Sequence, residues 1–207
     1  TYDRAYWMEH AERRAFPEAM YKQIAADGFV GTIVPEAYGG AGLGMLEMNL
    51  FMEGLSNQGI PLLSLVIGAT MSLGPIGVHG TEAQKQKYLP AACKGDIRFC
   101  FAITEPDAGT NTIRATTIAK PAANGRFKLN GRKTYITDGK ESDYALVVTR
   151  TTPHTEVQRK TDGFTLFIVD TKAKGIEMHP IPVSVPVPEV QYQVFVDDVD
   201  LGPEDVL

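Results

Sequence analysis

The residues best suited to chemistry lie in the run Phe101–Asn111, which reads FAITEPDAGTN. A strand-like start leads into a loop in which Thr104 and Thr110 supply hydroxyl groups that both donate and accept hydrogen bonds. Pro106 and Gly109 turn the chain outward, so we expect backbone N–H groups that are free for a ligand. Such a loop suits a phosphate, or the edge of a heteroaromatic ring that carries carbonyl and ring-nitrogen atoms.

The same loop contains two carboxylates, which general acid–base chemistry could use. Glu105 and Asp107 stand two residues apart, a spacing that puts side chains on one face of a strand. Pro106 between them breaks the strand, however. We therefore expect Glu105 to have a structural or capping role.

A second candidate element lies further along, in Gly131–Thr137. Tyr135, Ile136 and Thr137 repeat the order aromatic, aliphatic, hydroxyl that leads up to Thr104. An aromatic side chain on a strand is more often part of a core, but it can also flank a ring system that a nearby hydroxyl bonds. Together the two elements predict a cradle for a flat cofactor with polar edges.

Other features invite functional interpretations that the residues do not favour. Gly39–Gly44 is glycine-rich, but Met45 stands where the dinucleotide fingerprint needs its third glycine, so a turn is expected. His79 has no second histidine or cysteine at metal-ligand spacing and is interpreted as a loop histidine. Cys93 and Cys100 are more typical of buried free thiols than of a disulfide.

Composition limits the classes of protein and partner. The chain has 207 residues, of which 43% are hydrophobic and 22% charged, and it can hold one large or two small domains. Its formal net charge of -5 argues against a nucleic-acid partner. No apolar run reaches the roughly 18 residues of a membrane span, and no signal peptide is visible. We expect a cytoplasmic protein, and a truncated one, because it lacks an initiator Met and ends at Leu207, directly after the connection-like run Gly202–Val206.

Helical periodicity dominates the first part of the chain. Pro90 is expected to end the last helix of this part. Residues 1–94 are predicted to form an N-terminal α-helical domain. The helices are predicted at residues 3–27, with a break at Pro17, at Met45–Asn57, at Pro61–Ile76, and after a capping box at Thr81–Gln84.

From Gly95 onward the period changes to two, which is typical of strands. Asn124-Gly125 and Asn130-Gly131 predict hairpin turns, and residues 151–163 predict an exposed loop. The predicted fold class is α+β, with the helical domain followed by an antiparallel β-barrel domain over residues 95–207. Strands are predicted at residues 97–102, 112–119, 133–137, 144–149, 164–170, 176–178 and 191–196.

Four motifs resemble the acyl-CoA dehydrogenase family, and they occur in the family's order over most of the chain. Thr104–Thr110 resembles the signature T-E-P-x-A-G-S, and Asn130–Thr137 resembles N-G-x-K-x-W-I-T. Val34–Gly42 is similar to V-P-E-x-Y-G-G-x-G, and Gly80–Pro90 is similar to G-[ST]-E-x-Q-K-x-x-Y-L-P.

The resemblance implies a helical domain, a β-barrel middle domain and an FAD cofactor held between the barrel and a C-terminal helical domain. Thr104 is expected to bond the N5/O4 edge of the flavin. Thr110 is expected to touch the pantetheine arm of the substrate as well, which makes it the substrate-binding residue. By motif position, the cofactor contacts are Phe101, Ile103, Thr104, Gly109, Thr110, Tyr135, Ile136 and Thr137.

The implied reaction is α,β-dehydrogenation of an acyl-CoA, in which a carboxylate removes the α-proton and the β-hydrogen leaves as hydride. In the family the base is a Glu of the C-terminal domain, so we assign no catalytic residue here and expect the chain alone to be inactive. The expected partners are electron-transfer flavoprotein or a similar acceptor, and further copies in a homodimer or homotetramer. Alternatives are an acyl-CoA oxidase, a flavin monooxygenase or a non-catalytic flavin-binding relative.

The sequence departs from the family pattern at several positions. Thr110-Asn111 replaces Ser-Asp, Tyr135 replaces Trp, and Asp138 stands where Asn is usual. Ile181–Pro188 lacks the family's K-x-G-x-R, so the substrate or interdomain contacts made there do not carry over.

Overall fold

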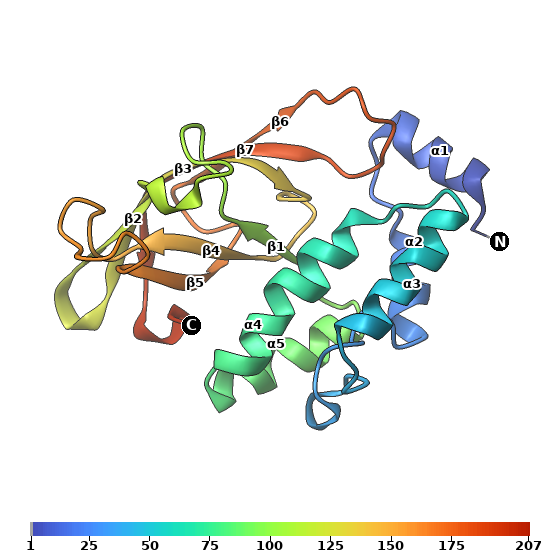
Figure 1. Ribbon diagram of the computed structural model, residues 1–207, viewed down its shortest axis with the longest axis horizontal. Coiled ribbons are helices and arrows are strands. Elements are labelled where there is room, and N and C mark those ends of the chain that lie inside the picture. Colours follow the sequence, from blue (N-terminus) through green and yellow to red (C-terminus); the bar gives the residue numbers. More distant parts are fainter. Residues whose placement is uncertain (1) are drawn as a thin grey trace. The chain divides into compact units, whose positions relative to one another are not determined.

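The structure is a computed structural model that describes residues 2–207, and it divides into two compact units. The first contains the chain up to Phe99 together with Val183–Val190, and the second contains Cys100–Pro182 and Gln191–Leu207. Figure 1 shows helices in the first unit and a sheet in the second, which confirms the α+β class. The predicted domain boundary between residues 94 and 95 stays a prediction.

The helices of the first unit bury large apolar side chains, including Trp7, Met48 and Leu89. A π-helical segment, Leu65–Leu73, runs directly into α4. None of the helices described for residues 2–207 has the length and apolarity that crossing a bilayer requires. The helices are α1 (Arg4–Arg13), α2 (Glu18–Ala26), α3 (Met45–Asn57), α4 (Gly74–His79) and α5 (Glu82–Cys93).

The capping box at the start of α5 is confirmed. The Gln84 N–H donates to the Thr81 hydroxyl at 3.2 Å, and the Thr81 N–H donates to the Gln84 side chain at 2.8 Å. The expected end at Pro90 is wrong, because the helix continues to Cys93. Proline removes one hydrogen bond but does not forbid a helix that packing holds, and Leu89 and Ala92 beside it are buried.

Segment Val183–Val190, the stretch without the family's basic residues, belongs to the helical unit. Arg14 donates to the Val183 carbonyl at one end. At the other end the buried Glu189 carboxylate accepts the Leu63 N–H at 2.7 Å, just before the π-helical segment. Burial raises the pKa of Glu189.

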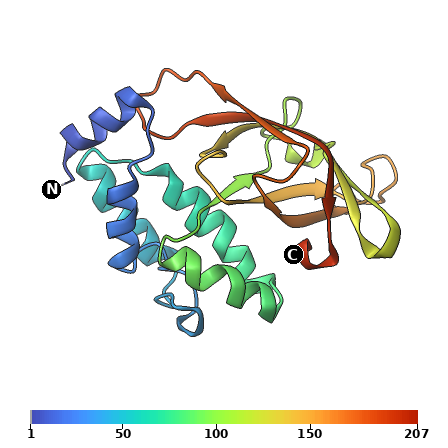
Figure 2. The same cartoon turned by 180° about the vertical axis from the view of Figure 1, so that it is seen from behind.

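The second unit is one curled sheet, seen from behind in Figure 2, where β3 and β7 run side by side. The strands are hydrogen-bonded in the order β1-β4-β2-β3-β7-β6, and β5 pairs with β4. They are β1 (Phe99–Ala102), β2 (Ile118–Pro121), β3 (Phe127–Thr137), β4 (Tyr144–Arg150), β5 (Phe164–Asp170), β6 (Ile176–Ile181) and β7 (Gln191–Leu201).

The expectation of a purely antiparallel barrel needs correction. Ile118 of β2 and Arg150 of β4 pair in parallel, and the strand order has two ends, so the sheet is mixed and open over the described residues. The cause is the hairpin between β2 and β3. Because β3 returns antiparallel to β2, the next strand along the chain runs in the direction of β2 again.

Two local predictions within the sheet fail. Asn130-Gly131 is not a turn, because β3 runs through it with a shift in register, and Gly131 has a φ of 155°. The predicted strand over residues 112–119 is mostly a loop that contains the 3-10 turn η3 (Thr112–Arg114). The turn at Asn124-Gly125 is confirmed, with positive φ at both residues.

Candidate functional site

The loop after β1 folds on itself. The Glu105 N–H donates to the Ala108 carbonyl, and the Ala108 N–H donates to the Glu105 carbonyl, both at 3.1 Å. Pro106 occupies the first central position of this turn, where its fixed φ is favourable. The expectation of free N–H groups therefore fails at these two residues. Within residues 2–207, the N–H groups of Gly109 and Thr110 have no protein acceptor.

The two candidate elements lie next to each other. The Thr134 N–H of β3 donates to the Thr104 carbonyl at 2.9 Å, which joins the loop after β1 to the Tyr135 region. The Thr104 hydroxyl, only partly buried, has no hydrogen-bond partner within the described residues. A hydroxyl that can both donate and accept is thus available beside the junction.

Tyr135 is held in an unusual conformation. Its φ is 55°, in the left-handed region that a bulky residue rarely adopts, and it sits at a shift in the register between β3 and β7. The residue is 61% exposed, although its neighbours Thr134 and Ile136 are buried. A strained backbone that turns an aromatic ring outward is typical of a binding site. We call Thr104, Gly109, Thr110 and Tyr135, all at least partly exposed, the rim.

Glu105 has the structural role that was expected, because its carboxylate holds the loop after β1 through buried hydrogen bonds. Its buried carboxylate accepts the Thr116 N–H at 2.7 Å, the Thr116 hydroxyl at 2.9 Å and the Thr117 N–H at 2.9 Å. Its Oε1 also lies 2.9 Å from the Lys133 ammonium. Burial alone would raise the pKa of Glu105, but Lys133 and these hydrogen bonds outweigh burial and lower it to about 2.

Lys133 completes the anchor and is buried as fully as Glu105. Its ammonium has three donors, and it uses them on Glu105, on the Ile103 carbonyl at 3.0 Å and on the Val148 carbonyl at 2.7 Å. One side chain of β3 therefore holds the chain on both sides of Thr104, at Ile103 and at Glu105. This fixes the loop after β1 against β3 and β4.

Arg150 holds the loops beside the rim. Its buried guanidinium donates to the carbonyls of Ala115, Ile113, Asp162 and Lys160 at 2.7 to 3.0 Å. Its face also lies 4.0 Å from the centre of the Phe164 ring, for a cation–π contact. The loop around η3 and the loop over residues 151–163 are thus fastened to the same side chain.

A hollow of about 270 Å³ opens next to these loops. Its walls are mostly apolar, and they include Ile103, Ile113, Val148 and Phe164. Ile103, one of the predicted cofactor contacts, lines this hollow and directly precedes Thr104 in the chain. Its size and lining suit part of a flat or extended ligand.

Five of the eight predicted cofactor contacts belong to the rim or line the hollow, and the other three lie elsewhere. Thr104, Gly109, Thr110 and Tyr135 form the rim, and Ile103 lines the hollow. Phe101 lies partly buried in β1. Ile136 is in the core, and the buried Thr137 hydroxyl already exchanges hydrogen bonds with the Gln191 side chain at 3.0 and 3.1 Å.

Sequence reasoning missed Lys133 and Arg150 as supports of the site. Arg150 carries a signal that could have been used, because a cation at the end of the largely apolar strand β4 needs acceptors if it is buried. Lys133 carries no such signal, because Lys128 and Arg132 lie in the same strand. Finding the acceptors themselves required the tertiary structure.

Family models match both parts of the chain. Residues 3–96 match the N-terminal domain of acyl-CoA dehydrogenases, and residues 100–199 match their middle domain.

Individual relatives agree with this match. Acyl-CoA dehydrogenase FadE12 of Mycobacterium tuberculosis is 35% identical over the whole chain, which covers 52% of that protein. The structure of butyryl-CoA dehydrogenase from Megasphaera elsdenii superposes with a TM-score of 0.85 at 27% identity, covering 97% of this chain and 52% of that one. The structure of an acyl-CoA dehydrogenase complexed with FAD, from Bacillus anthracis, superposes with a TM-score of 0.84 at 28% identity, and the match covers 97% of this chain and 34% of that one. The chain thus spans about half the length of the curated relatives it matches over its full extent. It belongs to the acyl-CoA dehydrogenase family, with the family's N-terminal and middle domains.

Proposed function

We propose that this chain is the flavin- and thioester-binding part of an enzyme that carries out FAD-dependent α,β-dehydrogenation of an acyl-CoA. The observation that carries the proposal is the hydrogen bond from the Thr134 N–H to the Thr104 carbonyl. It brings a partner-free hydroxyl and an outward-turned tyrosine to one rim, and both suit the edge and the face of a flat ring.

The donor set of the rim fits an isoalloxazine. The ring has carbonyl oxygens and ring nitrogens at its edge, which the Thr104 hydroxyl and the unpaired N–H groups of Gly109 and Thr110 can bond. A Cβ added at Gly109 would meet nothing within 4 Å, so the backbone there is open to a ligand. The Tyr135 ring supplies an aromatic surface. Ile136 and Thr137, which are buried, would contribute through their main chain.

Bound FAD supplies the hydride acceptor of the proposed reaction. The residues of this chain orient the thioester, exclude water and present hydrogen-bond donors. Thr110, whose hydroxyl is exposed, is the proposed contact to the pantetheine arm. We propose that the base comes from a part of the protein outside this chain, so the chain alone would not turn over.

The proposed partners follow from the same reading. One relative, 32% identical over 82% of this chain, is named as a subunit of a caffeyl-CoA reductase–Etf complex from Acetobacterium woodii. This supports electron-transfer flavoprotein, or a similar protein, as the electron acceptor.

Dye reduction without oxygen consumption would separate a dehydrogenase from an oxidase or a monooxygenase. Assembly as a dimer or tetramer is also part of the proposal.

We expect Thr104→Val to weaken FAD binding by about tenfold, the effect of losing one hydrogen bond to a polar ring atom. The substitution keeps the volume of the side chain and removes its hydroxyl. The measurement is the FAD dissociation constant of the protein at its natural length, from the quenching of flavin fluorescence.

Thr152→Val is the matched control. Thr152 lies in the loop over residues 151–163 and is not a rim residue. The substitution replaces a hydroxyl by a methyl group, as Thr104→Val does. Its FAD affinity should equal that of the wild type. Equal losses in the two variants would refute the assignment of Thr104 to the cofactor.

A further inference from the structure

The loop between β6 and β7 differs from its surroundings in composition and in attachment. Its residues Val183–Val190 belong to the helical unit, although the strands on either side belong to the sheet. The segment forms neither helix nor strand, and its prolines, Pro186 and Pro188, have no N–H to donate. Its place therefore depends on contacts to the helical unit more than on a backbone ladder of its own. We call Val183–Val190 the strap.

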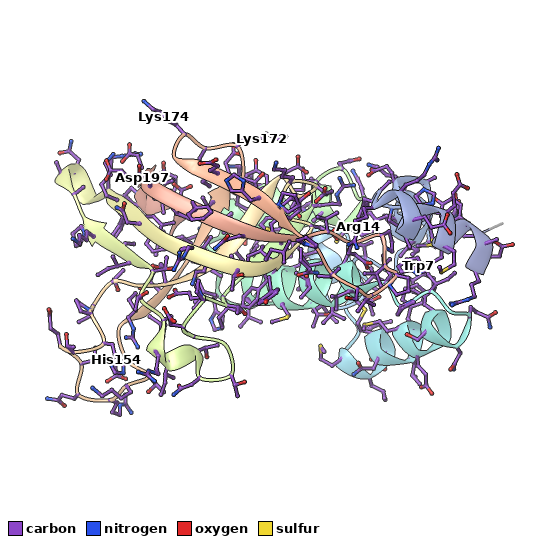
Figure 3. All side chains as sticks on the ribbon, turned by 90° about the horizontal axis from the view of Figure 1, so that it is seen from above. Trp7, Arg14, His154, Lys172, Lys174 and Asp197 are labelled. Atoms are coloured by element: carbon purple, nitrogen blue, oxygen red, sulfur yellow. The ribbon has the colours of Figure 1, made fainter. Side chains whose placement is uncertain are left out.

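Two anchors tie the strap to the helical unit, one near each end. Arg14 donates to the Val183 carbonyl, and Figure 3 shows Arg14 near this end of the loop. At the other end the Glu189 carboxyl group accepts the Leu63 N–H at 2.7 Å. Between the anchors Val185 is 59% exposed. The strap is thus held at its ends and open to solvent in its middle.

The anchor at Glu189 is a helix cap. The helix that starts at Leu63 continues into the π-helical segment Leu65–Leu73, and the first N–H groups of a helix lack partners within it. Glu189 Oε1 accepts the first of these N–H groups. Its Oε2 is buried and has no hydrogen-bond partner within residues 2–207. One oxygen of the cap is therefore satisfied and the other is not.

Glu189 also lacks a neutralising cation. It is fully buried and has no ion-pair partner among residues 2–207. The rest of the strap and the stretch 60–78 carry no ionisable side chain. Two arginines of the first helical stretch are engaged otherwise, since Arg14 donates at the other anchor and Arg4 donates to the Gly59 carbonyl at 3.2 Å. A negative charge on this cap would remain without a counter-charge.

Burial favours the neutral form of this carboxyl group. It raises the pKa of Glu189 above the ordinary value of 4.5, and the backbone hydrogen bonds at Leu63 and Ser64 lower the pKa by less. The unpartnered Oε2 adds to the preference, because a buried hydroxyl without a partner costs less free energy than a buried charge without one. The cap is therefore most stable while Glu189 carries a proton.

We propose that Glu189 is a latch operated by a proton, which holds the strap on the helical unit while the carboxyl group is neutral and releases that end when the group ionises. Arg14 keeps the other end in place, so the strap opens at one end. Leu63, Met52 and Val66 line an apolar hollow of about 120 Å³, so the latch also fixes one wall of that hollow. The latch goes beyond the proposed function and needs neither FAD nor substrate.

Release should increase with pH. The pKa of the held carboxyl group is raised, whereas a released group in water has the ordinary value of 4.5, so the released form binds fewer protons between these two values. The ratio of released to held strap should rise by about tenfold per pH unit above pH 4.5 and level off above the pKa of the held group. Below pH 4.5 the strap should stay held.

A spin label on Val185→Cys tests the latch in the protein at its natural length. Val185 is exposed, and the described cysteines Cys93 and Cys100 are buried, so the label reports on the strap. The unsubstituted protein, treated in the same way, supplies the background. Electron paramagnetic resonance from about pH 4.5 to about pH 8.5 should show a mobile component that grows as a one-proton titration. A spectrum that stays the same over this range would overturn the proposal.

Glu189→Gln, made in the labelled protein, assigns the titration to this residue. Glutamine is neutral at every pH, and its amide oxygen can accept the Leu63 N–H, so the label should stay immobile throughout. Glu189→Met also removes the titration but loses the cap, so the mobile component should be larger and independent of pH. A pH dependence that persists in either variant, or a mobile label at every pH in folded Glu189→Gln, would overturn the proposal.

Lys174→Cys is the matched control for the label. Lys174 is exposed in the loop between β5 and β6 and is labelled in Figure 3. A spin label there should give the same spectrum over the whole pH range. A change that parallels that of Val185→Cys would show a general effect of pH on the protein, and the latch would then be wrong.

Discussion

Lys133→Met should lower the free energy of unfolding by about 3–5 kcal/mol. Methionine keeps much of the volume of lysine but removes the ammonium that neutralises Glu105 in the core. The carbonyls of Ile103 and Val148 lose their donor in the same step. The loss is measured by denaturant unfolding, with the midpoint and the slope both recorded.

Two further variants make this result specific. Lys128→Met removes a partly exposed lysine of the same strand, 3.5 Å from Asp198, and should cost less than about 1 kcal/mol. Adding Glu105→Gln to Lys133→Met should recover part of the loss, because the buried charge without a partner is then gone. Similar stabilities for Lys133→Met and Lys128→Met would show that the buried pair does not anchor the loop.

The unfolding free energy should also fall steeply as the pH drops from about 5 to about 2. The pKa of Glu105 is lowered in the folded chain from an ordinary value of 4.5 to about 2, so the folded chain binds fewer protons than the unfolded chain in this range. The stabilisation from this carboxylate is therefore complete above the unfolded pKa and is lost on acidification. A shift of this size corresponds to about 3 kcal/mol.

Glu105→Gln isolates this contribution. Glutamine is neutral at every pH, so the variant should start less stable at pH 7 and lose about 3 kcal/mol less than the wild type between pH 5 and pH 2. Denaturant unfolding at several pH values measures both curves. Parallel curves would show that Glu105 does not have the lowered pKa that its buried contacts imply.

The sequence predicted elements well where local chemistry determines them. The box at Thr81 and Gln84 satisfies N–H groups within one turn, and the break at Pro17 follows from the proline ring. The limits of α3 and β5 were predicted to the residue, because amphipathic or apolar runs with clear ends mark them.

Predictions failed where tertiary contacts override a local preference. Asn130-Gly131 has the residues of a tight turn, yet pairing with β7 carries β3 straight through, and the Asn130 side chain accepts the Asp198 N–H at 2.9 Å. Residues 112–117 have the composition of a strand, but Glu105 and Arg150 take up their backbone groups and hold them as a loop.

The candidate site, too, could be predicted only as far as local sequence determines it. The motifs indicated which residues to consider, and the hydrogen bond between Thr134 and Thr104 confirms that the two elements meet. The motifs did not indicate that Tyr135 turns outward while Ile136 and Thr137 turn inward. That alternation depends on a shift in register and a positive φ, which residue types alone do not encode.

The central claim is that the rim holds a flavin, and a crystal structure of the FAD-loaded protein at its natural length tests it most directly. The account predicts the isoalloxazine edge within hydrogen-bond distance of the Thr104 hydroxyl, with the Tyr135 ring against the flavin. An isoalloxazine bound elsewhere, with the Thr104 hydroxyl facing water and Tyr135 free of contact, would contradict it.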